Sequence, residues 1–177
     1  MPQTPYVLTG VDVRRAADPE SSRFKIIDSF KAPAIKHKTI DHTQGGGIGS
    51  VKYVLPVLEA FEPSFETFGP DLDALSSVGL VAGQTDTWVF SGAYLVRGKA
   101  KPVANRIIVT GTVAEIDEGT HSGAGSDKQK TSHAIHGVTH YERHIEGVEK
   151  IYWDVDEPAF RVNGVDVFAD YRAALGI

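Results

Sequence analysis

Cysteine is absent from the 177 residues of the sequence. A disulfide, a thiolate nucleophile and a zinc-thiolate site are therefore excluded. Long apolar runs are missing too, since no stretch approaches the roughly twenty residues that a membrane helix needs. Residues 1–5 lack the basic and apolar regions of a signal peptide, so we expect a soluble protein that is made in the cytosol.

Positive charge is in short supply. The chain carries 18 Lys and Arg against 23 Asp and Glu, a formal net charge of −5, and its cations form no stripe. Tight binding of nucleic acid rests largely on cationic contacts to phosphate, so we do not expect it. The length suits one core, and we expect residues 1–177 to form a single domain. The 18 glycines and the hydrophobic share of 41% are typical of a β-rich chain with many turns.

Two alternating runs, residues 106–117 and 133–145, are joined by the polar, glycine-rich segment 118–130. Alternation with a period of two is typical of a strand that is buried on one face. One face carries the apolar residues Ile107, Val109, Val113, Ile135, Tyr141 and Ile145. The other face carries Thr110, Thr112, His136, His140, Glu142 and His144. The pattern predicts one long antiparallel hairpin.

Strands of about a dozen residues exceed the usual length of roughly five or six. A long unpaired edge invites uncontrolled strand addition. We therefore expect the hairpin to pair with further strands or to belong to a larger assembly.

The remaining elements are mostly short. Proline, two early acids and a closing glycine predict a helix over 70–79, and an amphipathic pattern predicts a second over 166–175. Asn163-Gly164 indicates a tight turn. Strands are expected over 6–13, 24–30, 34–42, 51–55, 58–68, 86–96 and 150–155.

A cluster of glycines interrupts the chain at residues 44–49. Such a loop can hold phosphate, but neither a following Gly-Lys-Ser/Thr nor a helix-forming segment is present. We interpret it as a flexible connector, or as a loop ordered by a neighbouring subunit.

Three histidines lie four residues apart, at His136, His140 and His144. On a helix they would suit zinc, but on a strand four residues span about 13 Å, too far for one ion. A polar, solvent-facing stripe is the better interpretation. Ser91 or Ser132 could join a histidine in a hydrolytic dyad, yet no Gly-x-Ser-x-Gly elbow is present. We expect neither enzymatic activity, nor a bound metal, nor a cofactor.

The order and spacing of several segments resemble the major tail tube protein of contractile-tailed bacteriophages. In the second half these are residues 90–94, 107–119, 126–128, the strand up to Tyr141, 162–166 and 175–177. The first half agrees more loosely, through residues 32–35 and 45–49. A longer insert around residues 16–22 departs from the pattern.

The resemblance implies a structural, non-enzymatic protein. It implies a mainly β fold: an antiparallel β-barrel or sandwich with a long hairpin, one short internal helix and a short C-terminal helix. Six copies would form a ring with a continuous inner β-barrel, and rings would stack into the tube that conducts DNA. Implied partners are further copies, the sheath, tape-measure, baseplate and tail-terminator proteins, with no membrane. The implied location is the virion tail, assembled in the cytoplasm of the host bacterium.

Site residues follow from this resemblance. The polar face of the hairpin would line the lumen through Thr110, Thr112, His136, His140 and Glu142. Two loops would contact the next ring through Gly45, Gly46, Gly47, Gly49, Gly119, Gly123, Gly125 and Asp127. Six copies carry a net charge of about −30, which would keep DNA from sticking to the wall. DNA would therefore pass through the lumen without binding specifically.

Three other functions remain open. The tube of a bacteriocin particle or of a type VI secretion system shares the architecture. A monomeric ligand-binding β-barrel would have an apolar interior cavity and no ring. A zinc hydrolase would retain metal on purification.

Overall fold

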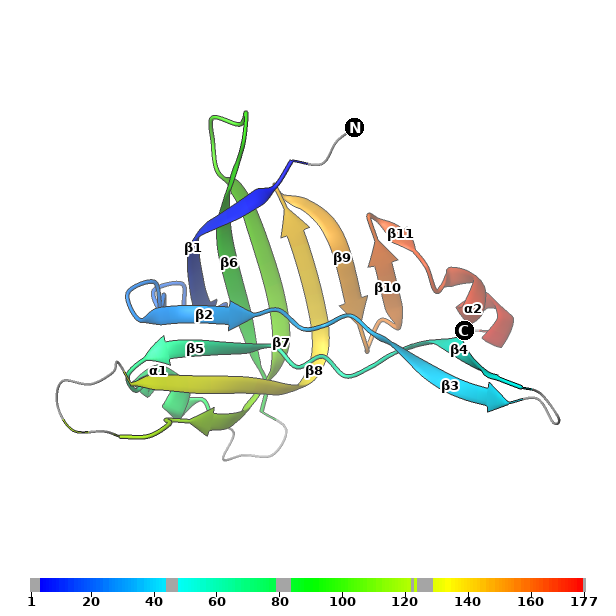
Figure 1. The fold of residues 1–177 in the computed structure, drawn as a ribbon, viewed down its shortest axis with the longest axis horizontal. Coiled ribbons are helices and arrows are strands. Elements are labelled where there is room, and N and C mark those ends of the chain that lie inside the picture. The colour runs from blue at the N-terminus through cyan, green and yellow to red at the C-terminus, as the bar shows by residue number, and fades with distance from the viewer. Residues whose placement is uncertain (1–3, 44–47, 79–83, 122, 124–128, 177) are drawn as a thin grey trace.

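The computed structural model describes residues 4–43, 48–78, 84–121, 123 and 129–176. Its strands are antiparallel, and the longest path of paired strands runs β1-β6-β7-β8-β9-β10-β11 (Figure 1). The elements are β1 (Tyr6–Arg15), β2 (Ile27–Lys31), β3 (His37–Thr43), β4 (Ser50–Leu58), β5 (Ser64–Phe68), α1 (Leu72–Ser76), β6 (Asp86–Val96), β7 (Val103–Asp117), β8 (Lys130–Ile145), β9 (Val148–Asp154), β10 (Ala159–Val162), β11 (Val165–Asp166) and α2 (Ala169–Leu175).

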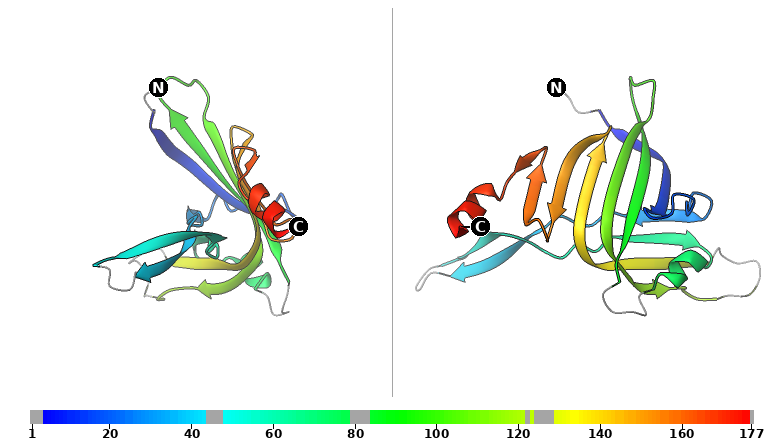
Figure 2. Two further views of the ribbon diagram at one scale, coloured as in Figure 1. Left: turned by 90° about the vertical axis from the view of Figure 1, so that its right-hand side faces the viewer. Right: turned by 180° about the vertical axis from the view of Figure 1, so that it is seen from behind.

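The predicted long hairpin is confirmed as β7 and β8, which pair from Asn105 with Ile145 to Asp117 with Ser132. The second half of β8 pairs with β9, whereas its first half pairs with β5. The change coincides with a shift in register between Thr110 and Thr112, opposite Gly137, whose φ is +59°. Such bulges bend a strand and increase its twist. We call the layer of β1, β6, β7, β9, β10, β11 and the second half of β8 the tall sheet. The strand β8 therefore belongs both to the tall sheet and to a lower layer with β2 and β5 (Figure 2).

The core lies where these two layers face each other. Trp88, Phe90, Ile107, Val109, Val113, Ile135 and Tyr141 are at most 1% exposed, and Phe65 packs on Trp88 with ring centroids 5.4 Å apart. The predicted apolar face of the hairpin is thus confirmed for five of its six residues, and the sixth, Ile145, is partly buried. Burial of these large side chains supplies most of the stabilisation of the fold.

An ion pair closes the core beside α1. Asp71 caps the helix, accepting a hydrogen bond from the backbone N–H of Ala74 at 3.0 Å. The same carboxylate binds the guanidinium of Arg23, and both side chains are at most 4% exposed. Arg23 also donates to Asp73 at 2.6 Å and lies over the ring of Trp88. A helix of only five residues is held in place by this contact rather than by its own propensity.

Two expectations need correction. Among the described residues the strands form no closed barrel, because β1 and β11 lie at the two ends of the path and each pairs with a single strand. The boundary expected between residues 55 and 58 is also wrong. β4 continues through Pro56 to Leu58, and the break falls at 59–63. A shift in register between His37 and Thr39 lets the hairpin accommodate this proline, consistent with its tolerance at bulges.

Gly111 sits where the bend of β8 approaches β7. A Cβ at this position would lie 2.8 Å from Cγ2 of Ile135 and 2.9 Å from the carbonyl oxygen of His136. We expect Gly111→Ala to lower the free energy of unfolding by about 1–3 kcal/mol, because backbone cannot move aside cheaply. Gly10→Ala is the matched control, since a Cβ there meets nothing within 4 Å. Urea unfolding of both variants would test this, and equal stabilities would contradict it.

Candidate assembly surfaces

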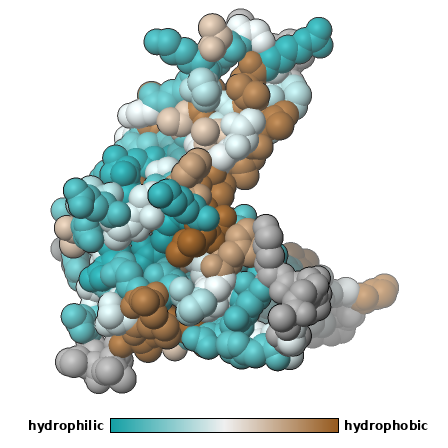
Figure 3. Space-filling model, turned by 90° about the vertical axis from the view of Figure 1, so that its left-hand side faces the viewer, coloured by the Kyte–Doolittle hydropathy of each residue, from teal (hydrophilic) through white to brown (hydrophobic). Residues whose placement is uncertain are grey.

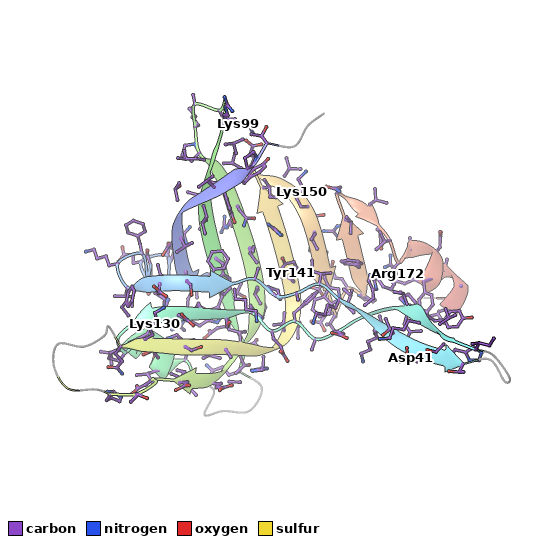
Figure 4. All side chains as sticks on the ribbon, in the orientation of Figure 1. Asp41, Lys99, Lys130, Tyr141, Lys150 and Arg172 are labelled. Atoms are coloured by element: carbon purple, nitrogen blue, oxygen red, sulfur yellow. The ribbon has the colours of Figure 1, made fainter. Side chains whose placement is uncertain are left out.

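The hairpin of β3 and β4 stands away from the rest of the chain as a separate two-stranded sheet. Every residue of β3 is exposed, and so are most residues of β4. Figure 4 shows its side chains, Asp41 among them, projecting clear of the sheet. We call residues 37–58 the arm. An isolated two-stranded hairpin is marginally stable in water, so packing against a partner would stabilise the arm.

The register gives the arm two unlike faces. Ile40 is opposite Tyr53 and His42 is opposite Val51, so these four share one face. Asp41 is opposite Lys52 on the other face. Ile40, Val51 and Tyr53 are 53%, 57% and 55% exposed, although such side chains normally lie in a core. Exposed apolar surface of this kind marks an interaction site.

The surface of the tall sheet that faces away from the core is polar and carries a chain of ion pairs. His140 lies between two carboxylates, with Nδ1 2.7 Å from Asp154 and Nε2 3.1 Å from Glu142. Carboxylates only accept hydrogen bonds, so both contacts form when the ring carries a proton on each nitrogen. The second oxygen of Glu142 accepts from His144 at 2.8 Å.

Further pairs extend this cluster across β9 and β10. The backbone N–H groups of Asp156 and Glu157, together with His140, outweigh burial and lower the pKa of Asp154. Arg161 lowers the pKa of Glu149 through two hydrogen bonds, at 3.2 and 2.9 Å. Burial and a hydrogen bond to Glu157 raise the pKa of Tyr152 to about 12. Asp154 and Glu149 are therefore held ionised beside His140 and Arg161, respectively.

Three of the five residues predicted for the lumen lie outside this cluster. The hydroxyl of Thr110 hydrogen-bonds that of Thr87 at 2.9 Å, and Thr112 donates to the carbonyl of Gln84 at 2.7 Å. His136 pairs with Thr112 across the hairpin and is partly exposed. The structure thus places all five on one sheet surface but joins only His140 and Glu142 by a direct contact.

The predicted stacking loops are described only in part. Gly49 lies in an exposed bend at the tip of the arm, and Gly119 has a φ of +66° directly after β7. A Cβ on Gly123 would meet nothing within 4 Å. Gly45, Gly46, Gly47, Gly125 and Asp127 lie outside the described residues.

His133 is fully buried in the core, stacked on Phe65 with ring centroids 4.5 Å apart. Burial lowers its pKa below 6.5 and Arg23 adds to this, whereas Asp71 opposes it. The unfolded chain therefore binds a proton at this histidine more readily than the folded chain does. We expect stability to fall as the pH drops from about 7 to 5, and to rise with pH across that window.

The His133→Gln variant isolates this effect from the other titrating groups. The stability advantage of the parent chain over the variant should shrink as the pH falls, as measured by urea unfolding at several pH values. An advantage that is constant with pH would contradict the assignment.

The structure offers little to the other functions considered. Among the described residues, no group of three or more His, Asp or Glu could hold a metal ion. The hollow between the tall sheet and β2 measures about 440 Å³ and is open to one side (Figure 3). Its walls include Leu8, Tyr94 and Ile107. An open hollow of this shape differs from the enclosed interior expected of a ligand-binding barrel.

Comparison with known proteins bears on these surfaces. Within the described residues, no helix is both long and apolar enough to cross a membrane. No curated protein matches the chain. The profile of the family described as phage tail tube protein FII matches residues 18–176.

Proposed function

This chain belongs to the phage tail tube protein FII family, and we propose on that basis that six copies form a ring and that rings stack into the inner tube of a contractile tail. Membership makes it a structural component of the virion tail and not an enzyme. In the proposed tube DNA passes through the lumen during ejection.

The observation that carries the proposal is the uncovered apolar face of the arm. Among the residues that the structure describes, no other strand or helix covers Ile40, Val51 and Tyr53, which stay more than half exposed. A chain that assembles with itself supplies the missing cover from a second copy. Burial of each such side chain contributes about 1.5–3 kcal/mol, enough in sum for a stable contact.

Open sheet edges support the same assignment. Among the described strands β1 pairs only with β6, so no strand covers its other edge, where the N–H of Arg23 donates to the carbonyl of Val13 and the N–H of Arg15 donates to Ser21. Tyr6, Val7 and Leu8 on this edge are about half exposed. Joining subunits edge to edge removes this liability and would close the open sheets of six copies into one inner barrel.

We assign the lumen to the polar surface with Thr110, Thr112, His136, His140 and Glu142. This surface is polar and uncovered in the subunit, whereas the other face of the same sheet forms the core. Asp154, Glu142 and Glu149 pair with basic side chains at 2.7, 2.8 and 2.9 Å, which makes those basic side chains less available to DNA phosphates. Gly49 at the tip of the arm and Gly119 after β7 are assigned to contacts between rings.

The remaining partners follow from this role. The sheath would surround the tube, the tape-measure protein would occupy it during assembly, and the baseplate and tail-terminator proteins would bound its ends. Assembly would take place in the cytoplasm of the host bacterium. A bacteriocin or type VI secretion tube is the nearest alternative, which neighbouring capsid and terminase genes would exclude.

Negative-stain electron microscopy of the purified chain, with light scattering on the same sample, tests the proposal. Rings or stacked tubes with a central hole are the expected result. A monomer that persists at high concentration in the presence of tube seeds would contradict it.

A further inference from the structure

Arg143 lies on the face of the tall sheet that forms the core. Its Nε donates to Oδ1 of Asn105 at 3.1 Å, and Asn105 is only 4% exposed. Among the described residues, Arg143 makes no ion pair and no other hydrogen bond. A buried amide thus fixes the guanidinium while its two terminal nitrogens stay free.

Arg143 lines a largely apolar pocket of about 270 Å³. The other walls are Tyr6, Tyr94, Val103 and Ile145, with Asn105 beside Arg143. The pocket continues into the hollow above β2. A guanidinium with one edge engaged presents the other as a fork of two donors, which matches a carboxylate. Apolar walls exclude water and strengthen the attraction.

An exposed carboxylate lies at the far end of the same sheet. Asp170 in α2 is exposed and makes no hydrogen bond or ion pair with any described residue. No residue of α2 is buried, and Tyr171 and Leu175 beside it are 49% and 59% exposed. The helix is attached mainly through Phe168, which contacts Phe160, and through Arg172, which binds Asp166 and the carbonyl of Pro158.

The pocket and the helix lie at opposite ends of the subunit. Two residues of the pocket, Tyr6 and Tyr94, belong to β1 and β6. These strands lead to the end of the sheet where the turn with Lys99 lies, whereas α2 follows β11 and carries Arg172 (Figures 1 and 4). A closed ring requires this arrangement, because each copy must join its neighbour through two different surfaces. We propose that Arg143 binds Asp170 of the neighbouring copy, while Tyr171 and Leu175 of that helix pack against Tyr6 and Tyr94. This contact rests on the proposed ring.

Charge reversal tests the pair. Arg143→Asp and Asp170→Arg should each weaken association about tenfold or more, because each leaves a like charge in the pocket. The double variant should recover most of the loss. Arg106→Asp is the control and should leave association nearly unchanged, because Arg106 is an exposed arginine on the other face of the sheet. Sedimentation velocity at several concentrations measures association. Independent losses that add in the double variant would overturn the pairing.

Cysteine cross-linking gives a second test that does not depend on charge. Because the chain has no cysteine, Tyr6→Cys with Tyr171→Cys introduces the only two thiols. Oxidation should produce a ladder of covalent oligomers on a denaturing gel. Val54→Cys with Tyr171→Cys is the control, because Val54 is exposed on the arm and should not meet α2.

The outcomes separate this contact from the proposed function. Rings in the microscope without a cross-link between positions 6 and 171 would overturn the contact and leave the tube standing. Cross-linked oligomers that never close into rings would support the contact and contradict the tube. Absence of any association would contradict both.

Discussion

Replacing Tyr53 with aspartate should abolish tube formation while leaving the subunit folded. Tyr53 is 55% exposed on the apolar face of the arm, so it contributes little to the stability of one subunit. In the tube a charge at this position would be buried against a second copy without a partner, which is strongly unfavourable. Electron microscopy should show no tubes, and circular dichroism should show an unchanged unfolding temperature.

The control for this variant lies one residue away. Val54→Asp introduces the same charge in the same strand, at a residue that is 67% exposed but opposite Thr39 on the other face of the arm. It should reduce tube formation far less. If both variants assemble equally well, the apolar face of the arm is not the contact.

Asp71→Ser should produce the largest loss of stability of any conservative change near α1. Serine still caps the helix, so the variant removes the negative charge while keeping the cap. Arg23 then stays 3% exposed with one carboxylate fewer, and breaking a buried pair typically costs about 3–5 kcal/mol. Urea unfolding measured by circular dichroism should show this loss.

A double-mutant cycle distinguishes the pair from a general disturbance of the core. Arg23→Met should also destabilise the fold, but Arg23→Met with Asp71→Ser should cost less than the sum of the two. In the double variant both charges are removed, so neither stays buried without its partner. Additive losses would show that the two side chains act independently. Asp73→Ala should cost less than Asp71→Ser, because Asp73 is 40% exposed.

The hairpin of β7 and β8 could be predicted because it is long and buried on one face only, so its alternation is visible over many residues. The two helices could also be located, the first from the residues around its cap and the second from Gly176, which ends it in the left-handed conformation. The same alternation would have placed His133 in the core, because it lies two residues before Ile135 on the apolar face.

Other features depend on contacts that no local pattern records. Arg23 and Asp71 are 48 residues apart, and each alone reads as an ordinary surface charge. The strand β8 bends at Gly137 and therefore takes part in two layers, although its sequence pattern predicts one straight strand. The arm was expected as two strands, but whether strands dock on a core is decided by the remainder of the fold. Ile40 and His42 alternate along one strand of the arm, and Val51 and Tyr53 alternate along the other. This pattern could have indicated one largely apolar face.

The pairing of β1 with β6 has a consequence for the order of events during folding. Strands β6 to β9 follow one another along the chain, whereas Tyr6 pairs with Val96 across about half of the sequence. Closing so long a loop is slow compared with forming adjacent hairpins. We expect β1 to join last, and Tyr6 brings one wall of the Arg143 pocket with it. A subunit would then become competent to polymerise only once it has finished folding, which protects partly folded chains from incorporation.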